Sequence, residues 1–252
     1  MQDFHHGFND PHTPRESFDS LSLETQMRVC PWRHTPGAII LAVLTLITIG
    51  YSGFRVATGN FHTVVPGKLY RSGQMTERQW TAYLQHYAIK SVLNLRGAHQ
   101  GAGWYQEEVR AATQLGVTHY DVKLSAIREV DDAMLETILA LMRRAPTPLW
   151  IHCLSGADRS GLIAAIYLFA IEGQQAEIAA HQLSLFYGHF PYLWSRSGAM
   201  DRSFWSSVAN YRKRESLGSQ TLDFPIHDCR ILPRKGNFAT ELSCPLGTPR
   251  SR

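Results

Sequence analysis

The sequence has few cysteines, no internal repeat and a small net charge, and these absences exclude several classes of protein. Its 252 residues include four cysteines, at positions 30, 153, 229 and 244, whose spacing matches neither a zinc site nor a dense disulfide framework. A formal charge of +4 is too small to indicate an anionic partner by itself. We therefore predict no metal site, no bound cofactor and no nucleic-acid partner.

Charged residues are also missing from residues 35–54, a run of twenty. As an α-helix this run would be about 30 Å long, which matches the hydrocarbon core of a bilayer. A buried core helix and a cleaved signal peptide are the alternatives, but a long polar leader precedes the run and no small-residue cleavage site follows it. We predict a disordered tail over residues 1–34 and a transmembrane anchor over residues 35–54, whose flanking positive charges do not decide its orientation.

Beyond the anchor, short apolar runs alternate with amphipathic segments. This alternation predicts one α/β domain over residues 64–211, with a mainly parallel central sheet flanked by helices. Residues 216–252 are rich in Gly, Pro, Ser and Arg, and we expect them to be weakly structured. The expected strands cover residues 68–70, 91–95, 117–122 and 148–152, and the expected helices cover residues 77–87, 104–115, 133–144, 161–171, 175–186 and 199–211.

The most informative segment runs from His152 to Ser160 and joins the last expected strand to an apolar helix. A helix that begins just after a sharp loop presents unpaired backbone N–H groups and the positive end of its dipole, which favour a bound anion. Gly156 allows the backbone conformation that a tight ring demands, and the planar fork of Arg159 can hold two phosphate oxygens. We predict a phosphate-binding loop whose contacts come from Leu154, Ser155, Gly156, Ala157, Arg159 and Ser160.

The positive field of this loop also stabilises the thiolate form of Cys153, so that the side chain can act as a nucleophile at neutral pH. We expect His152 to orient the loop through hydrogen bonds and Ser160 to donate a hydrogen bond to the sulfur. An isolated cysteine is most often a buried core residue. Here the Gly, Arg and Ser that follow, between a strand and a helix, favour a catalytic cysteine.

The spacing His-Cys-x5-Arg-Ser at residues 152–160 resembles the motif of the protein tyrosine phosphatase superfamily. Residues 64–211 resemble its compact dual-specificity branch, including atypical bacterial members. The resemblance implies hydrolysis of phosphate monoesters, on phosphotyrosine or with dual specificity, through a cysteinyl-phosphate intermediate. Some bacterial members are exported, so we expect a single-pass membrane protein with a periplasmic catalytic domain, in which Cys229 and Cys244 could form a disulfide.

The resemblance also implies a general acid, usually an Asp on a loop before the active-site strand. Here that loop is residues 125–132, where Glu129 and Asp131 are both candidates. We expect Asp132 to cap the next helix. Asp121 lies on the preceding strand and is expected to be structural.

Asp158 and Arg71 each have two interpretations. Asp158 could supply the proton from within the loop, because some bacterial phosphatases and the myotubularin-like lipid phosphatases carry Asp at this position. Otherwise it is a helix N-terminal residue stabilised by the helix dipole. Arg71, in the segment 71–74, is either a substrate contact, as the resemblance implies, or an exposed residue of an ordinary turn.

The sequence leaves the substrate open between a phosphorylated protein and a phosphorylated lipid or inositol, because loop lengths do not reveal the depth of a pocket. Two other classes of function use similar features. A rhodanese-like sulfurtransferase also places a cysteine loop ahead of a helix, and a catalytically weak module could bind phosphate without turnover. The His before Cys153 and the Arg-Ser pair at residues 159–160 favour phosphate chemistry.

Overall fold

The computed structural model describes residues 36–216, 230–233 and 239–243 of the chain, which divides into two compact units, Met1–Thr45 and Leu46–Arg252. The predicted tail over residues 1–34 lies outside the described residues, and so do Cys30, Cys229 and Cys244 with the disulfide expected between the last two.

Helix α1 (Pro36–Thr58) contains the uncharged run and has no buried residue. By length and composition it could cross a membrane. It continues four residues beyond the expected anchor, 35–54, because nothing between Arg55 and Thr58 stops a helix. It ends before Gly59, whose φ of +62° leaves the helical region.

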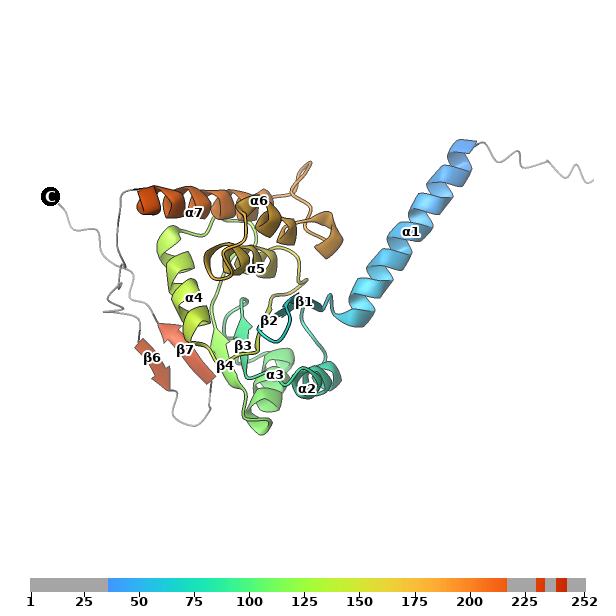
Figure 1. The fold of residues 1–252 in the computed structure, drawn as a ribbon. Coiled ribbons are helices and arrows are strands. Elements are labelled where there is room, and N and C mark those ends of the chain that lie inside the picture. The colour runs from blue at the N-terminus through green and yellow to red at the C-terminus, as the bar shows by residue number, and fades with distance from the viewer. Residues whose placement is uncertain (1–35, 217–229, 234–238, 244–252) are drawn as a thin grey trace, which may run out of the picture. The chain divides into compact units, whose positions relative to one another are not determined.

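A seven-stranded sheet forms the centre of the second unit (Figure 1). The strand order is β1-β2-β5-β3-β4-β7-β6, and only the two edge strands, β1 and β6, pair antiparallel with their neighbours. The expected mainly parallel sheet is therefore confirmed. The strands are β1 (His62–Val65), β2 (Leu69–Ser72), β3 (Ser91–Asn94), β4 (Thr118–Asp121), β5 (Leu149–His152), β6 (Arg230–Pro233) and β7 (Ala239–Ser243).

The C-terminal segment 216–252, expected to be weakly structured, contains two strands, β6 and β7. β6 and β7 form a hairpin-like pair there, and β7 also pairs with β4. The backbone groups of β4 would otherwise lie at an open sheet edge, and pairing with β7 satisfies them. This pairing explains why a segment rich in Gly, Pro, Ser and Arg still forms strands.

Helices cover both faces of the sheet (Figure 1). One face carries α2 (Glu77–His86) and α3 (Gly103–Gln114), and the other carries α4 (Asp132–Arg144), α5 (Arg159–Ala170) and α7 (Gly198–Ser216). Thr76 forms the capping box of α2 with Gln79. These helices agree with the sequence prediction to within a few residues, except that α7 extends to Ser216.

The expected helix over residues 175–186 is wrong. The structure has a short α6 (Ala176–Ala179) followed by two 3₁₀ turns, η1 (Ala180–Gln182) and η2 (Leu185–Tyr187). The Arg71 guanidinium donates a hydrogen bond to the backbone carbonyl of Gln182 at 2.7 Å. That oxygen is therefore not bonded to a backbone N–H group one helical turn later.

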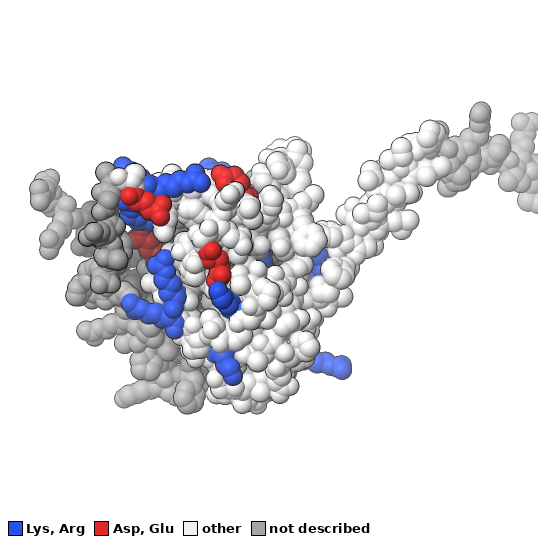
Figure 2. Space-filling model, in the orientation of Figure 1, with Lys and Arg blue, Asp and Glu red and all other residues white. Residues whose placement is uncertain are grey.

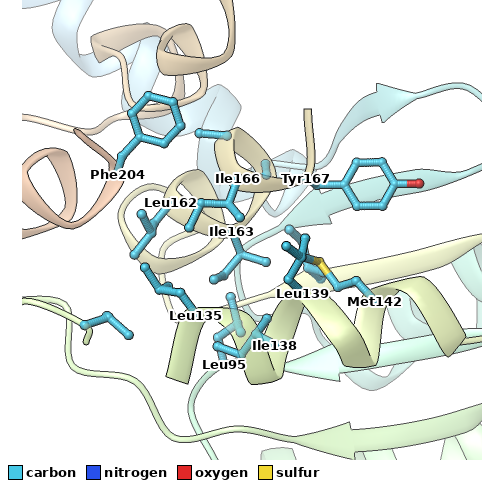
Figure 3. Packing of buried hydrophobic residues seen from close by; sticks show 14 of the residues in the cluster. Leu95, Leu135, Ile138, Leu139, Met142, Leu162, Ile163, Ile166, Tyr167 and Phe204 are labelled. Atoms are coloured by element: carbon cyan, nitrogen blue, oxygen red, sulfur yellow. The ribbon is translucent and has the colours of Figure 1, made fainter. Parts of the chain in front are cut away.

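Helix α5 is buried along almost its whole length, as expected for its apolar sequence. Its Leu162, Ile163 and Ile166 pack against side chains of α4 (Figure 3). Burying each such side chain contributes about 1.5–3 kcal/mol. The packing holds the first turn of α5 rigidly at the carboxyl end of β5, where the predicted site lies.

Candidate active site

The loop between β5 and α5 lies at the carboxyl end of a central strand. β5 is flanked by β2 and β3, with His152 in register with Ser72 on one side and Asn94 on the other. The Cys153 backbone N–H donates to the Ser72 carbonyl at 3.3 Å, and the Cys153 side chain is 1% exposed. Three parallel strands thus converge where the loop begins, which is the place where open α/β sheets bind ligands.

Gly156 has a φ of +72°, a backbone conformation that glycine adopts without strain. A Cβ atom at this position would lie 2.5 Å from the Gly73 backbone nitrogen and 2.7 Å from the Ser72 carbonyl carbon. Both are backbone atoms of the neighbouring segment and cannot rotate away. The loop is therefore closed so tightly against residues 72–73 that only glycine fits.

Replacing Gly156 by alanine is expected to lower the free energy of unfolding by about 2 kcal/mol more than the same change at Gly116. Gly116 has a similar φ of +65°, but a Cβ atom there would have no other atom within 4 Å, so Gly116→Ala costs only the strain of the backbone conformation. Urea unfolding of the full chain measures both variants. Equal losses would show that the loop can relax around a methyl group.

Cys153 and Ser160 face each other inside the loop. The Cys153 Sγ lies 3.4 Å from the Ser160 Oγ, which agrees with the predicted hydrogen bond to the sulfur. Leu154 and Ser155 form the exposed rim, whereas Gly156 and Ala157 are buried. Cys153 is therefore buried beneath a loop whose exposed residues are Leu154 and Ser155.

Arg159 stands at the start of α5 and is held by two neighbouring loops. Its Nη1 donates to the carbonyl of Leu95 at 3.3 Å and to that of Leu124 at 3.4 Å. Within the described part of the chain its other terminal nitrogen has no protein acceptor. The guanidinium is thus anchored on one side and free to bind an anion with the other.

Arg71 has a different place from both sequence interpretations. It lies on β2 and is fully buried, so the exposed-turn alternative is wrong. Its Nη2 donates to the carbonyls of Gly156 at 2.7 Å and Ala157 at 3.0 Å, and its guanidinium stacks on Tyr187. Burial lowers the pKa of Arg71 to about 10, although nearby anionic groups oppose this. These hydrogen bonds fix the two loop carbonyls towards Arg71.

Arg96 is a second basic residue near the site, and it lies just after the end of β3. It lies over the Trp104 ring at 3.5 Å, and its Nη1 donates to the Gln74 side chain at 2.7 Å. Burial and then the charge of Arg159 lower the pKa of Arg96. Its position directly after a parallel strand was a signal that could have identified it.

A buried network holds His152. The Glu108 Oε1 lies 2.7 Å from the Nε2 atoms of both His152 and His119, and none of the three side chains is more than 2% exposed. Burial raises the pKa of Glu108, but the charges and hydrogen bonds of the two histidines outweigh it and bring the pKa from 4.5 to about 2. Glu108 falls on the apolar face of α3 with Tyr105, Val109 and Ala112, so helical periodicity could have identified it.

We expect Glu108→Gln to lower the free energy of unfolding by about 3 kcal/mol at pH 7, because it removes the negative charge that contacts both buried imidazoles. The pKa of Glu108 is lower in the folded than in the unfolded protein, so the charged carboxylate stabilises the fold above pH 4.5. This contribution is lost as the pH falls towards 2. The difference between wild type and variant should therefore shrink below about pH 4. Glu177→Gln, which changes an exposed ion pair with Arg212, serves as the control with an effect under about 1 kcal/mol.

Asp158 contacts a histidine that no sequence motif singled out. His189 Nδ1 lies 2.7 Å from Asp158, and His189 Nε2 lies 2.8 Å from Asp201 on α7. Burial lowers the pKa of His189, but the hydrogen bonds to the two carboxylates outweigh it and raise the pKa above its ordinary value. The Asp158 side chain makes no capping bond to α5. No sequence pattern links His189 to the loop, because it comes from an irregular segment.

The other candidate acids have structural partners. Glu129 is exposed and pairs with Arg202 on α7. Asp131 accepts a hydrogen bond from the Met134 backbone at 2.8 Å and caps α4, so the predicted cap at Asp132 is wrong by one residue. α4 starts one residue earlier than expected, at Asp132.

Asp121 is a structural residue, as predicted. It accepts hydrogen bonds from Asn94 and Tyr105 in the buried interior beside β4. Among the described residues, no group of three or more His, Cys, Asp or Glu side chains is arranged to hold a metal ion.

Comparison with known proteins identifies relatives of the chain. The model of the tyrosine phosphatase family matches residues 51–183, more than half of the 252 residues. The chain is 30% identical over 117 residues to the dual specificity protein phosphatase TpbA of Pseudomonas aeruginosa strain UCBPP-PA14, a match that covers 46% of this chain and 49% of TpbA. It thus spans about half the length of that relative.

Two solved structures are also similar to the described fold. The crystal structure of Pseudomonas aeruginosa TpbA has a TM-score of 0.44 at 23% identity, covering 60% of this chain and 92% of that one. The catalytic domain of the PP-IP phosphatase Siw14 of S. cerevisiae has a TM-score of 0.47 at 19% identity, covering 62% and 93%. On the match of the family model, which includes the loop from Cys153 to Arg159, the chain belongs to the tyrosine phosphatase family.

Proposed function

We propose that the protein is a cysteine-dependent phosphatase that hydrolyses phosphate monoesters, on phosphotyrosine or with dual specificity. The observation that carries the proposal is the ring around Cys153. The Cys153 thiol lies beside the Ser160 hydroxyl, Arg159 follows in the same loop with Nη1 bound to a neighbouring carbonyl, and the loop turns through a positive φ at Gly156. Membership of the family and the name of the relative TpbA support the same activity.

The reaction follows in two steps from this arrangement. The Cys153 sulfur attacks phosphorus while the bond to the leaving oxygen breaks, and a general acid protonates that oxygen. Arg159 and the loop amides stabilise the negative charge on the non-bridging phosphate oxygens. Water then attacks phosphorus, its proton passes to the carboxylate formed in the first step, and Cys153 leaves as a thiolate that Ser160 stabilises.

Asp158 is the acid that the geometry supports best. It belongs to the loop itself, and the His189 imidazole at 2.7 Å holds its carboxyl group in place. Glu129 is paired with Arg202 on the surface, and the Asp131 carboxylate is committed to the α4 cap.

A leaving-group test identifies the acid. Asp158→Asn is expected to lower kcat for phenyl phosphate about 100-fold but to affect 4-nitrophenyl phosphate much less, because nitrophenolate leaves without a proton. The alkaline limb of the pH profile should flatten as well. Glu129→Gln and Asp131→Asn are the controls. If one of them shows this pattern and Asp158→Asn does not, the assignment to Asp158 is wrong.

The activity itself is tested by phosphate release from 4-nitrophenyl phosphate and a phosphotyrosine peptide. Turnover of either supports the proposal. If treatment with thiosulfate yields a persulfide at Cys153 and sulfur transfer to cyanide without any phosphatase activity, the protein is a sulfurtransferase instead. Tight binding of phosphate with no turnover of any monoester indicates a phosphate-binding module.

The protein is further proposed to be a single-pass membrane protein with α1 as its anchor and its catalytic domain in the periplasm. The length and composition of α1 support the anchor, and the resemblance to exported bacterial phosphatases supports the orientation. Protease added to spheroplasts is expected to digest the catalytic domain. Protection of that domain until the membrane is dissolved would place it in the cytoplasm.

A further inference from the structure

Residues 185–194, between Ser184 and α7, carry large apolar side chains on the protein surface. We refer to them as the aromatic loop. Leu193 is 78% exposed and Trp194 is 92% exposed. Residues 183–194 contain no Lys, Arg, Asp or Glu, and the surface at the upper right of the domain, where this loop lies, is drawn white in Figure 2. The exposed large apolar side chains of the loop are Leu185, Phe186, Phe190, Tyr192, Leu193 and Trp194.

Hydrogen bonds along the backbone of the loop hold it in this conformation. The Tyr187 carbonyl accepts from the Asn60 side chain at 2.9 Å, and the Phe190 carbonyl accepts from the Ser197 hydroxyl at 3.0 Å. Between them His189 is fixed by its two carboxylates. An apolar surface that is held in place by so many specific contacts indicates a surface with a partner.

The aromatic loop is joined to the last turns of α1. The Tyr51 hydroxyl lies 2.7 Å from the carbonyls of both Leu185 and Phe186. One turn later, Arg55 is the first charged residue after the apolar run of α1, and its Nη2 donates to the Ser155 carbonyl at 3.1 Å. Tyrosine and arginine at the end of a membrane-spanning helix mark the interface between lipid and water. The aromatic loop and the rim of the catalytic loop are therefore both attached at that level of α1.

We propose that the aromatic loop inserts into the bilayer interface beside α1 and that the enzyme acts on phosphate monoesters carried by membrane lipids. Tryptophan, tyrosine and phenylalanine side chains are those that favour this interface. Leu154 and Ser155 are the exposed residues of the loop that contains Cys153, and the Ser155 carbonyl is hydrogen-bonded to Arg55, so this loop lies beside the end of α1 at which a headgroup phosphate would be presented. The substrate part of this proposal rests on the proposed phosphatase activity.

The experiment uses the full chain in nanodiscs of phosphatidylcholine that contain phosphatidylinositol 4-phosphate. The variant Leu193→Ser/Trp194→Ser is compared with wild type and with Trp205→Ser, which changes another exposed tryptophan, on α7. The double variant should lower kcat/KM for the lipid at least about tenfold and leave that for soluble 4-nitrophenyl phosphate within about twofold. Trp205→Ser should change neither value.

Tryptophan fluorescence tests the insertion independently of activity. Brominated phosphatidylcholine should quench wild-type emission, and Trp194→Phe should remove part of that quenching whereas Trp205→Phe should not. Absence of a Trp194 contribution overturns the insertion. Equal effects of the double variant on lipid and soluble substrate overturn the lipid preference, and a selective loss on a phosphotyrosine peptide would show a peptide-docking surface instead. An enzyme inactive on every monoester contradicts the proposed function, but the quenching result would still decide the insertion.

Discussion

Replacing Cys153 by serine is expected to lower kcat/KM for every phosphate monoester by at least about 10⁴-fold. A serine hydroxyl is a much weaker nucleophile than a thiolate, and no base stands beside residue 153 in the described part of the chain to activate it. The side-chain oxygen that contacts the sulfur is the Ser160 hydroxyl at 3.4 Å, and a hydroxyl is not a base. The His152 Nε2 is hydrogen-bonded to Glu108 at 2.7 Å, and no hydrogen bond joins the His152 ring to Cys153 in the described residues.

The same variant should keep its affinity for phosphate. The ring is made by the backbone, by Gly156 and by Arg159, none of which changes in Cys153→Ser. Titration with inorganic phosphate should give a Kd within about threefold of wild type, and urea unfolding should show a change of no more than about 1 kcal/mol. Loss of both phosphate binding and activity would mean that serine disturbs the ring. Cys153→Ala has no polar group at this position, so phosphate binding by this variant would show whether the loss comes from the serine side chain or from removal of the nucleophile. Activity that survives in both variants would exclude Cys153 as the nucleophile.

Local sequence was sufficient to predict the strand, loop and helix that carry the candidate site, because they form one continuous segment. Cys153, Gly156, Arg159 and Ser160 lie within eight residues, and a strand, a loop and a helix in that order leave few geometries for them. The helices of the domain followed from their apolar periodicity for the same reason, since that signal is local.

The parts that depend on distant segments could not be predicted in this way. Arg71 was assigned to a turn, but pairing with β5 extends β2 to Ser72 and buries the guanidinium behind the loop. His189 reaches Asp158 from an irregular segment 31 positions later in the chain. Neither contact has a periodic signature, because each is set by how the segments pack. The expected helix over residues 175–186 failed for the same reason, since the buried Arg71 competes for the Gln182 carbonyl.

Arg159→Lys is expected to lower kcat/KM about 100- to 1000-fold, although it keeps the positive charge. In the wild-type guanidinium, Nη1 donates to the Leu95 and Leu124 carbonyls, and Nε has no partner among the described residues. A lysine ammonium is a single point of charge, so it can either bond to these two carbonyls or contact the phosphate. It also lacks the planar pair of N–H groups that bind two phosphate oxygens at the same time.

The matched control for this change is Arg143→Lys on α4, where an exposed arginine also donates to a carbonyl, that of Ala170 at 3.3 Å. It removes the same group from a position outside the site and should leave kcat/KM unchanged. The loss in Arg159→Lys should appear in kcat as well as in the affinity for phosphate, because Arg159 binds the non-bridging oxygens most strongly as their charge builds in the transition state. A change in KM alone would mean that Arg159 only captures the substrate. An unchanged kcat/KM would show that a positive charge at this position, together with the backbone amides, is all that the loop requires, and that the planar fork of the guanidinium adds nothing to catalysis.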